Sequence, residues 1–168
     1  TDNTRVAIVA AMRRREVYAT SGPRIAVRTY GGLNLSPTVL ETPGFPRSIQ
    51  TQAVPMGGEI MGAGAGDGFS LAIEAQADPK SGYLDRIQVV KGWIDATGET
   101  WERVYDVAWS GDDRLQPDGS LSLVGSSVDL KTGLTADTIG SPRLTVVWQD
   151  PAFDPAQSAF YYVRVLQI

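Results

Sequence analysis

Two residue types, cysteine and histidine, are missing from this 168-residue chain. Without cysteine it can form no disulfide, no thiolate nucleophile and no Cys-ligated zinc or iron–sulfur site. Without histidine it lacks the side chain that most often serves as a general base or a metal ligand. The composition therefore excludes several catalytic and metal-binding classes, but it does not identify a function.

Basic residues are also scarce, with 15 Lys and Arg against 19 Asp and Glu and a net charge of −4. The chain has no basic patch of the kind that binds nucleic acid, and no segment approaches the ~18 apolar residues of a membrane span. We therefore expect neither nucleic acid nor a membrane as a partner. The polar start, Thr1–Arg5, does not resemble a signal peptide. Because a cysteine-free chain suits an exported, periplasmic or cytoplasmic protein, the localisation stays open.

One segment near the N-terminus predicts a helix. Residues 6–16 contain neither Gly nor Pro, and three N-cap candidates precede them: Asp2, Asn3 and Thr4. Arg13, Arg14 and Arg15 fall in the expected last turn, where cations suit the helix dipole. This cluster favours a solvated helix end, with a phosphate-binding cluster as the alternative.

The rest of the chain predicts β-structure. Residues 69–76 alternate between apolar and polar side chains, which is typical of a half-buried strand. Further strands are expected at 25–30, 84–94, 100–109, 121–130, 144–149 and 160–166. Gly and Pro turn signals separate them, whereas 31–68 is irregular and is expected to be the least ordered or the most partner-dependent part. The pattern predicts a mainly β fold, an immunoglobulin-like antiparallel β-sandwich with one N-terminal α-helix.

Three patterns carry a weak signal for chemistry. The glycine run at 62–68 lacks Gly-Lys-Ser/Thr and precedes a strand, so it favours a flexible connection over a phosphate loop. Asp112, Asp113 and Asp118 do not have EF-hand spacing and favour a turn over a calcium site. Asp150 and Asp154 both precede proline, so they favour turns over the paired carboxylates of a glycosidase.

An aromatic pattern marks the strand expected at 100–109. Trp101, Tyr105 and Trp109 are expected on one face, and Trp93 lies on the preceding strand. Exposed rings of this kind bind sugars by stacking, but aromatic side chains in a sandwich more often pack in the core. The exposure of the three tryptophans separates the two interpretations.

Five stretches carry a resemblance to a known family: residues 11–25, 54–58, 84–95 (LDRIQVVKGWID), 104–111 (VYDVAWSG) and 150–166. The chain resembles the C-terminal part of a large bacterial family of uncharacterised proteins with a domain of unknown function. The N-terminal part of that family resembles PHP-type metal-dependent hydrolases, so the resemblance implies a divalent metal in the parent protein. No position of this chain matches a metal ligand of the family.

The resemblance also implies a domain organisation. Residues 1–24 would be a helix and a junction from a missing hydrolase domain, and residues 25–168 would form the β-sandwich domain, so the chain is expected to be a fragment. Ser21 and Arg24 lie at this junction and are the expected substrate-binding residues of the parent, with a turn and a surface arginine as the alternative. No catalytic or metal-binding residue and no cofactor is expected in this chain.

These observations lead to three hypotheses on function. The first is a non-catalytic β-sandwich accessory domain of a metal-dependent hydrolase, whose partner is the missing N-terminal hydrolase domain. The second is a carbohydrate- or polymer-binding module with an aromatic face, and the third is a small hydrolase that uses carboxylates alone. The chain alone is not expected to be an enzyme. Self-association is expected through the helix or through an open edge at 160–166, with docking of the helix on the sandwich as the alternative.

Overall fold

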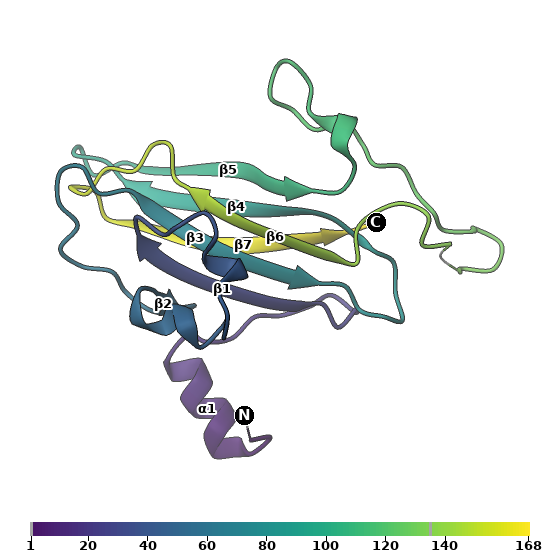
Figure 1. Cartoon of the computed structure of the whole chain (residues 1–168), viewed down its shortest axis with the longest axis horizontal. Helices are drawn as coiled ribbons and strands as arrows, with labels where there is room; N and C mark the ends of the chain where they lie inside the picture. Colours follow the sequence, from purple (N-terminus) through teal and green to yellow (C-terminus); the bar gives the residue numbers. More distant parts are fainter. Residues whose placement is uncertain (1, 135) are drawn as a thin grey trace. The chain divides into compact units, whose positions relative to one another are not determined.

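The computed structural model of the chain describes residues 2–134 and 136–168 (Figure 1). It is mainly β, with two antiparallel sheets and one short α-helix among the described residues, as expected for a β-sandwich. The elements are α1 (Arg5–Arg13), β1 (Ala26–Leu33), β2 (Val54–Pro55), β3 (Phe69–Gln76), β4 (Leu84–Ile94), β5 (Thr100–Trp109), β6 (Arg143–Gln149) and β7 (Ala159–Gln167). Short 3₁₀ turns are η1 (Val39–Glu41), η2 (Ser48–Thr51) and η3 (Asp112–Arg114). No helix in the described ranges is long and apolar enough to cross a membrane.

The strands form one four-stranded and one three-stranded sheet. The first has the order β2-β1-β3-β6, and the second has the order β5-β4-β7, with β4 antiparallel to both neighbours. By contacts, the chain divides into two compact units. The first comprises residues up to Ser21, 28–73 and 146–155, and the second comprises residues 22–27, 74–145 and 156–168.

The first unit has its own small core. Leu35, Val39, Ile49 and Ala72 are buried together, and partly buried side chains, including Tyr30 and Phe45, pack against them. Two of the four core residues come from η1 and η2. The stretch 31–68 therefore contributes to the core although it contains little regular structure. That it is the least ordered part of the chain stays a prediction.

The helix α1 begins where the sequence predicts and ends earlier. Thr4 is the N-cap, and its Oγ1 accepts a hydrogen bond of 3.2 Å from the backbone N–H of Ala7. The helix ends at Arg13 because Arg15 adopts a left-handed conformation with φ 62°. The N–H groups of Arg15 and Glu16 then bond back to the carbonyls of Met12 and Ala11, which is a Schellman motif.

The prediction of a strand at 121–130 is wrong. Only isolated bridges occur there, such as the one between Leu121 and Leu115, and Leu123 and Leu130 are almost fully exposed. Local side-chain bonds replace strand pairing: Asp129 Oδ1, for example, accepts from the N–H of Lys131. Asp and Ser side chains compete with the sheet for backbone groups in this way.

The strand β3 has the predicted bounds but not the predicted half burial. Every residue from Phe69 to Ala75 is buried, including Ser70 and Glu74. β3 lies between β1 and β6 in the sheet, and the burial of successive residues means that both of its side-chain faces are covered. Glu74 is compensated because its Oε1 accepts from Arg143 at 2.9 Å and 2.8 Å. A buried carboxylate requires such a partner.

Candidate functional site

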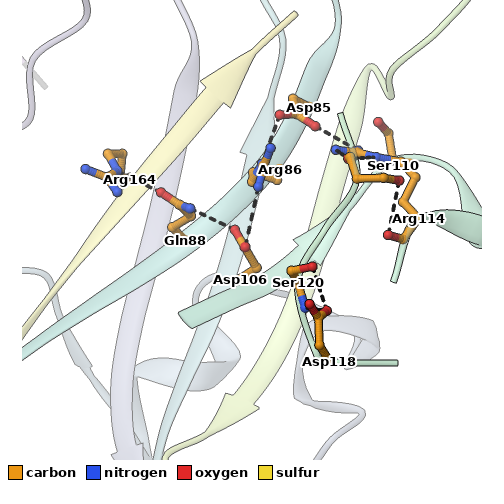
Figure 2. A network of polar contacts seen from close by, with 10 residues as sticks. Asp85, Arg86, Gln88, Asp106, Ser110, Arg114, Asp118, Ser120 and Arg164 are labelled. Atoms are coloured by element: carbon orange, nitrogen blue, oxygen red, sulfur yellow. Dashed lines mark hydrogen bonds and ion pairs between the residues drawn. The ribbon is translucent and has the colours of Figure 1, made fainter. Parts of the chain in front are cut away.

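The second unit contains a connected polar network on β4 and β5 (Figure 2). Three polar residues of β4, Asp85, Arg86 and Gln88, interrupt a strand whose apolar side chains Ile87 and Val89 are fully buried. Asp85 is an extra residue in the pairing of β4 with β7, where the register shifts between Leu84 and Arg86. Such a bulge re-aims side chains locally.

Arg86 is the centre of the network. Its Nε donates a hydrogen bond of 2.9 Å to Asp85 Oδ2, and a terminal nitrogen lies 3.4 Å from Asp106 Oδ2. Burial opposes the charge of Arg86, but the hydrogen bond and charge of Asp85, together with Asp106, raise its pKa above the usual value. The guanidinium is therefore a permanently charged bridge between two carboxylates.

The network continues across the sheet from Asp106. Its Oδ1 accepts a 2.8 Å bond from the Gln88 amide, and Gln88 Oε1 accepts a 2.8 Å bond from Nε of Arg164 on β7. Figure 2 shows these side chains as one line of contacts over the three strands. Each amide and guanidinium orients the next group.

At the other end of the network, Arg114 fixes the segment that follows β5. It is 7% exposed and forms a 2.7 Å ion pair with Asp85 Oδ1. It also donates to the carbonyl of Ser110 at 2.9 Å and twice to the carbonyl of Ser122 at 3.0 Å. A guanidinium is suited to this role because its donors point in fixed directions.

The chemistry open to this network is limited. All four oxygens of Asp85 and Asp106 face an arginine or the Gln88 amide. Within residues 2–134 and 136–168, no three Asp or Glu side chains gather in a way that could hold a metal ion. The arrangement stabilises the sheet and the segment after it, and it does not present a carboxylate pair to a cleft.

The structure places the two residues expected to bind substrate as follows. Ser21 is exposed at a bend in the first unit, and Arg24 is exposed in the second unit. The backbone N–H of Arg24 donates a 2.7 Å bond to Asp78 Oδ2. This bond, followed by that from the N–H of Lys80, lowers the pKa of Asp78. The role of Ser21 and Arg24 in binding substrate stays a prediction.

The aromatic pattern on β5 is split by a bulge. Trp101 pairs with Trp93, and Trp109 pairs with Arg86, but the register shifts between Ile87 and Gln88 of β4. Because Trp93 and Arg86 point to opposite faces of β4, the expectation that Trp101 and Trp109 share a face is wrong. Trp101 is half exposed, while Trp93 and Trp109 are partly buried.

Two acidic patterns from the sequence form turns. Asp118 Oδ1 accepts from both the N–H and the hydroxyl of Ser120, which lowers its pKa. Asp150 is buried, and its Oδ1 accepts from the N–H of Ala152. These contacts are typical Asx turns.

One hollow lies in the first unit, with a volume of about 340 Å³. It is lined by Gly31 and Gly32 of β1, the segment 50–54 and Ile60, and none of its lining residues carries a charge. Small-molecule sites combine an apolar wall with a few convergent polar groups. The polar side chains at this hollow are those of Gln50, Thr51 and Gln52.

The sequence signal for the network is the set of polar residues Asp85, Arg86 and Gln88 within an otherwise apolar part of β4. Its partners on β5, β7 and the following segment are distant in sequence.

Comparison with known proteins identifies a family: the family model described as "Protein of unknown function (DUF3604)" matches residues 1–168. The chain belongs to this family. Comparison of the chain with curated proteins and with solved structures found no match.

Proposed function

We propose that this DUF3604 chain is a non-catalytic accessory domain that docks through α1 on a preceding hydrolase domain of the same polypeptide. The observation that carries the proposal is the exposure of α1. None of its residues is buried, and its large apolar side chains are exposed at helical spacing: Val6 80%, Ile8 49%, Val9 40% and Met12 61%. An apolar helix side of this kind requires a partner surface.

The helix is also held at one end, which favours docking over simple fraying. The backbone of Gly57, with φ 84°, lies against the carbonyl of Arg14, and a side chain at position 57 would collide there. Next to this contact, Arg15 and Glu59 form a 2.8 Å ion pair. A helix anchored at its C-terminal end presents its apolar residues in a defined direction.

The chemistry is assigned to the preceding domain. The resemblance to PHP-type hydrolases implies that a divalent metal and its ligands belong to that domain. The carboxylates of the present network are already used by arginines, which favours a structural role here. Ser21 and Arg24, at the junction, are the residues of this chain proposed to contact substrate.

The proposal is tested first by the reading frame upstream of Thr1 and by assay of the purified chain. We expect an upstream segment rich in His and Asp motifs, and no phosphoester turnover by the chain with Mn²⁺ or Zn²⁺. Metal-dependent turnover by the pure chain, abolished by a chelator, would contradict the accessory role. An upstream reading frame that encodes no hydrolase domain would contradict the proposal, because α1 would then lack its proposed partner.

A carbohydrate- or polymer-binding module is the second candidate. It is supported by Trp101, whose half-exposed indole is held by a 2.8 Å bond from Nε1 to Asp95 Oδ2. Pull-down on insoluble polysaccharides compares the chain with Trp101→Ala, with Leu123→Ala as a control at another exposed position. Binding lost only in Trp101→Ala would favour this function. A carboxylate-only hydrolase has the least support, because the two carboxylates that the network brings together, Asp85 and Asp106, are already paired with arginines.

A further inference from the structure

One face of the sheet β5-β4-β7 carries an ordered pattern of side chains. Residues directly opposite each other in antiparallel strands point to the same face, so the register defines three rows across the sheet. We call them the three-row face: Glu102–Gly92–Phe160, Val104–Val90–Tyr162 and Asp106–Gln88–Arg164, each written from β5 over β4 to β7. All nine residues belong to the second unit.

Apart from Glu102, whose exposed carboxylate lies at the edge of the face on β5, the first two rows form an apolar patch. Phe160 is 61% exposed, Tyr162 47% and Val104 42%, whereas the central Val90 is covered. The Phe160 ring lies over Gly92, where a Cβ would collide with it. The rings of Phe160 and Tyr162 are nearly parallel, with centroids 6.4 Å apart. An apolar patch with a polar rim marks a protein interaction site.

The third row provides charges of opposite sign. Asp106 lies on one edge strand and Arg164 on the other, and Gln88 orients both through 2.8 Å bonds. Arg164 is exposed, and Nε is its donor to Gln88. Arg86 and Gln88 already contact Asp106, but its side chain keeps 25% exposure, and each carboxylate oxygen can accept more than one hydrogen bond. The row therefore holds a partly exposed carboxylate and an exposed guanidinium at fixed positions on either side of β4.

We propose that the three-row face binds the same face of a second copy of this chain, with the two-fold axis parallel to β4. This rotation places β5 over β7 of the second copy and each row over the same row. Val104 then meets the partner's Tyr162, and Asp106 meets the partner's Arg164, each twice by symmetry. A two-fold axis perpendicular to β4 would instead bring Glu102 against the partner's Asp106. The charge pattern selects the first arrangement, because like charges across an interface are unfavourable.

This inference uses β4, β5 and β7 only and does not depend on α1 or on the proposed function. It also differs from pairing at an open strand edge, because the contacts are between side chains of two sheet faces. Aligned packing of two such faces is one of the two arrangements that sheets adopt.

The test uses two variants that repair each other. Val104→Glu and Tyr162→Lys each place an unpaired charge in the interface, and we expect each to weaken the dimer at least tenfold. When the two variants are mixed, the carboxylate introduced at position 104 of one copy faces the ammonium group introduced at position 162 of the other, so a heterodimer should form again. Leu123→Glu is the matched control at an exposed position outside the face. Sedimentation velocity measures the dimer fraction, and near-UV circular dichroism verifies that each variant is folded.

The proposal requires a dimer of the wild type and of Leu123→Glu, monomers of the two single variants, and a dimer of their mixture. A wild-type monomer throughout the micromolar range overturns it and points to a different partner. A dimer that persists in both single variants places the interface elsewhere. Failure of the mixture to dimerise excludes the proposed two-fold arrangement.

Discussion

The indole Nε1 of Trp101 donates a hydrogen bond of 2.8 Å to Oδ2 of Asp95, within the hairpin that joins β4 to β5. The other carboxylate oxygen, Oδ1, accepts from the hydroxyl of Thr97 at 2.6 Å and from the N–H groups of Thr97 and Glu99 at 2.9 Å and 3.0 Å. One exposed carboxylate thus fixes both the turn and the tryptophan.

We predict that this hairpin loosens at low pH. The hydrogen bonds from Thr97, and next from Trp101, lower the pKa of Asp95 from 3.8 to about 2. A lowered pKa in the folded state stabilises the fold above the unfolded value, and this contribution is lost as the pH falls through the window from 3.8 to about 2. The Trp101 fluorescence should change in this window, and Asp95→Asn should remove that change. An unaltered titration in Asp95→Asn would assign it to another group.

We predict that Gly57→Ala destabilises the first unit by about 1 kcal/mol or more. Gly57 combines a φ of 84° with close contact to the carbonyl of Arg14, so the added methyl group is strained twice. Gly62→Ala is the matched control, because Gly62 has a φ of 76° and open space around its Cβ position. Thermal unfolding should separate the two variants. Equal losses would mean that the Arg14 contact contributes nothing beyond the backbone conformation.

We predict that Arg114→Ala destabilises the second unit by about 3 kcal/mol or more, because a buried ion pair loses one partner. Asp85 Oδ1 would lose its cation, and the carbonyls of Ser110 and Ser122 would lose their donors. Arg13→Ala, at an exposed arginine, should change the free energy of unfolding by less than about 0.5 kcal/mol. Urea titration measures both. A loss below about 1 kcal/mol in Arg114→Ala would show that the network behaves like a surface ion pair.

We predict that Arg24→Ala weakens substrate binding or turnover in a polypeptide that includes the preceding domain. The exposed Arg24 side chain is suited to phosphate or carboxylate, and its backbone contact to Asp78 does not require the side chain. The comparison is with Lys131→Ala, another exposed cation. Unchanged activity with a lowered melting temperature would make Arg24 a structural residue.

The sequence predicted elements whose signals are local. The bounds 69–76, 84–94 and 100–109 agree with β3, β4 and β5, because alternation and flanking turn residues act over a few positions. Segment 121–130 has apolar residues at strand-like spacing, but no strand in the described part of the chain pairs along it to bury them. The helix α1 ends before the predicted Glu16, because an arginine, Arg15, takes the left-handed position that usually belongs to glycine.

The candidate site was harder to predict, since its geometry depends on pairing between distant strands. Asp85 and Arg86 were visible as polar residues in an apolar strand, but their partners Asp106 and Arg114 lie about 20 and 30 positions away. Two bulges set which side chains meet, and one of them separates Trp109 from Trp101. No local pattern in the sequence marks either bulge.

Hydrogen exchange of the α1 amides reports whether α1 is docked, because docking would exclude water from a helix that has no buried residue in this chain. The measurement compares this chain with a polypeptide that also contains the preceding domain. We expect rapid exchange at residues 5–13 in the chain alone and at least about tenfold slower exchange in the longer polypeptide, with the exchange in the core of β4 unchanged. Equal exchange at residues 5–13 in the two proteins would contradict it.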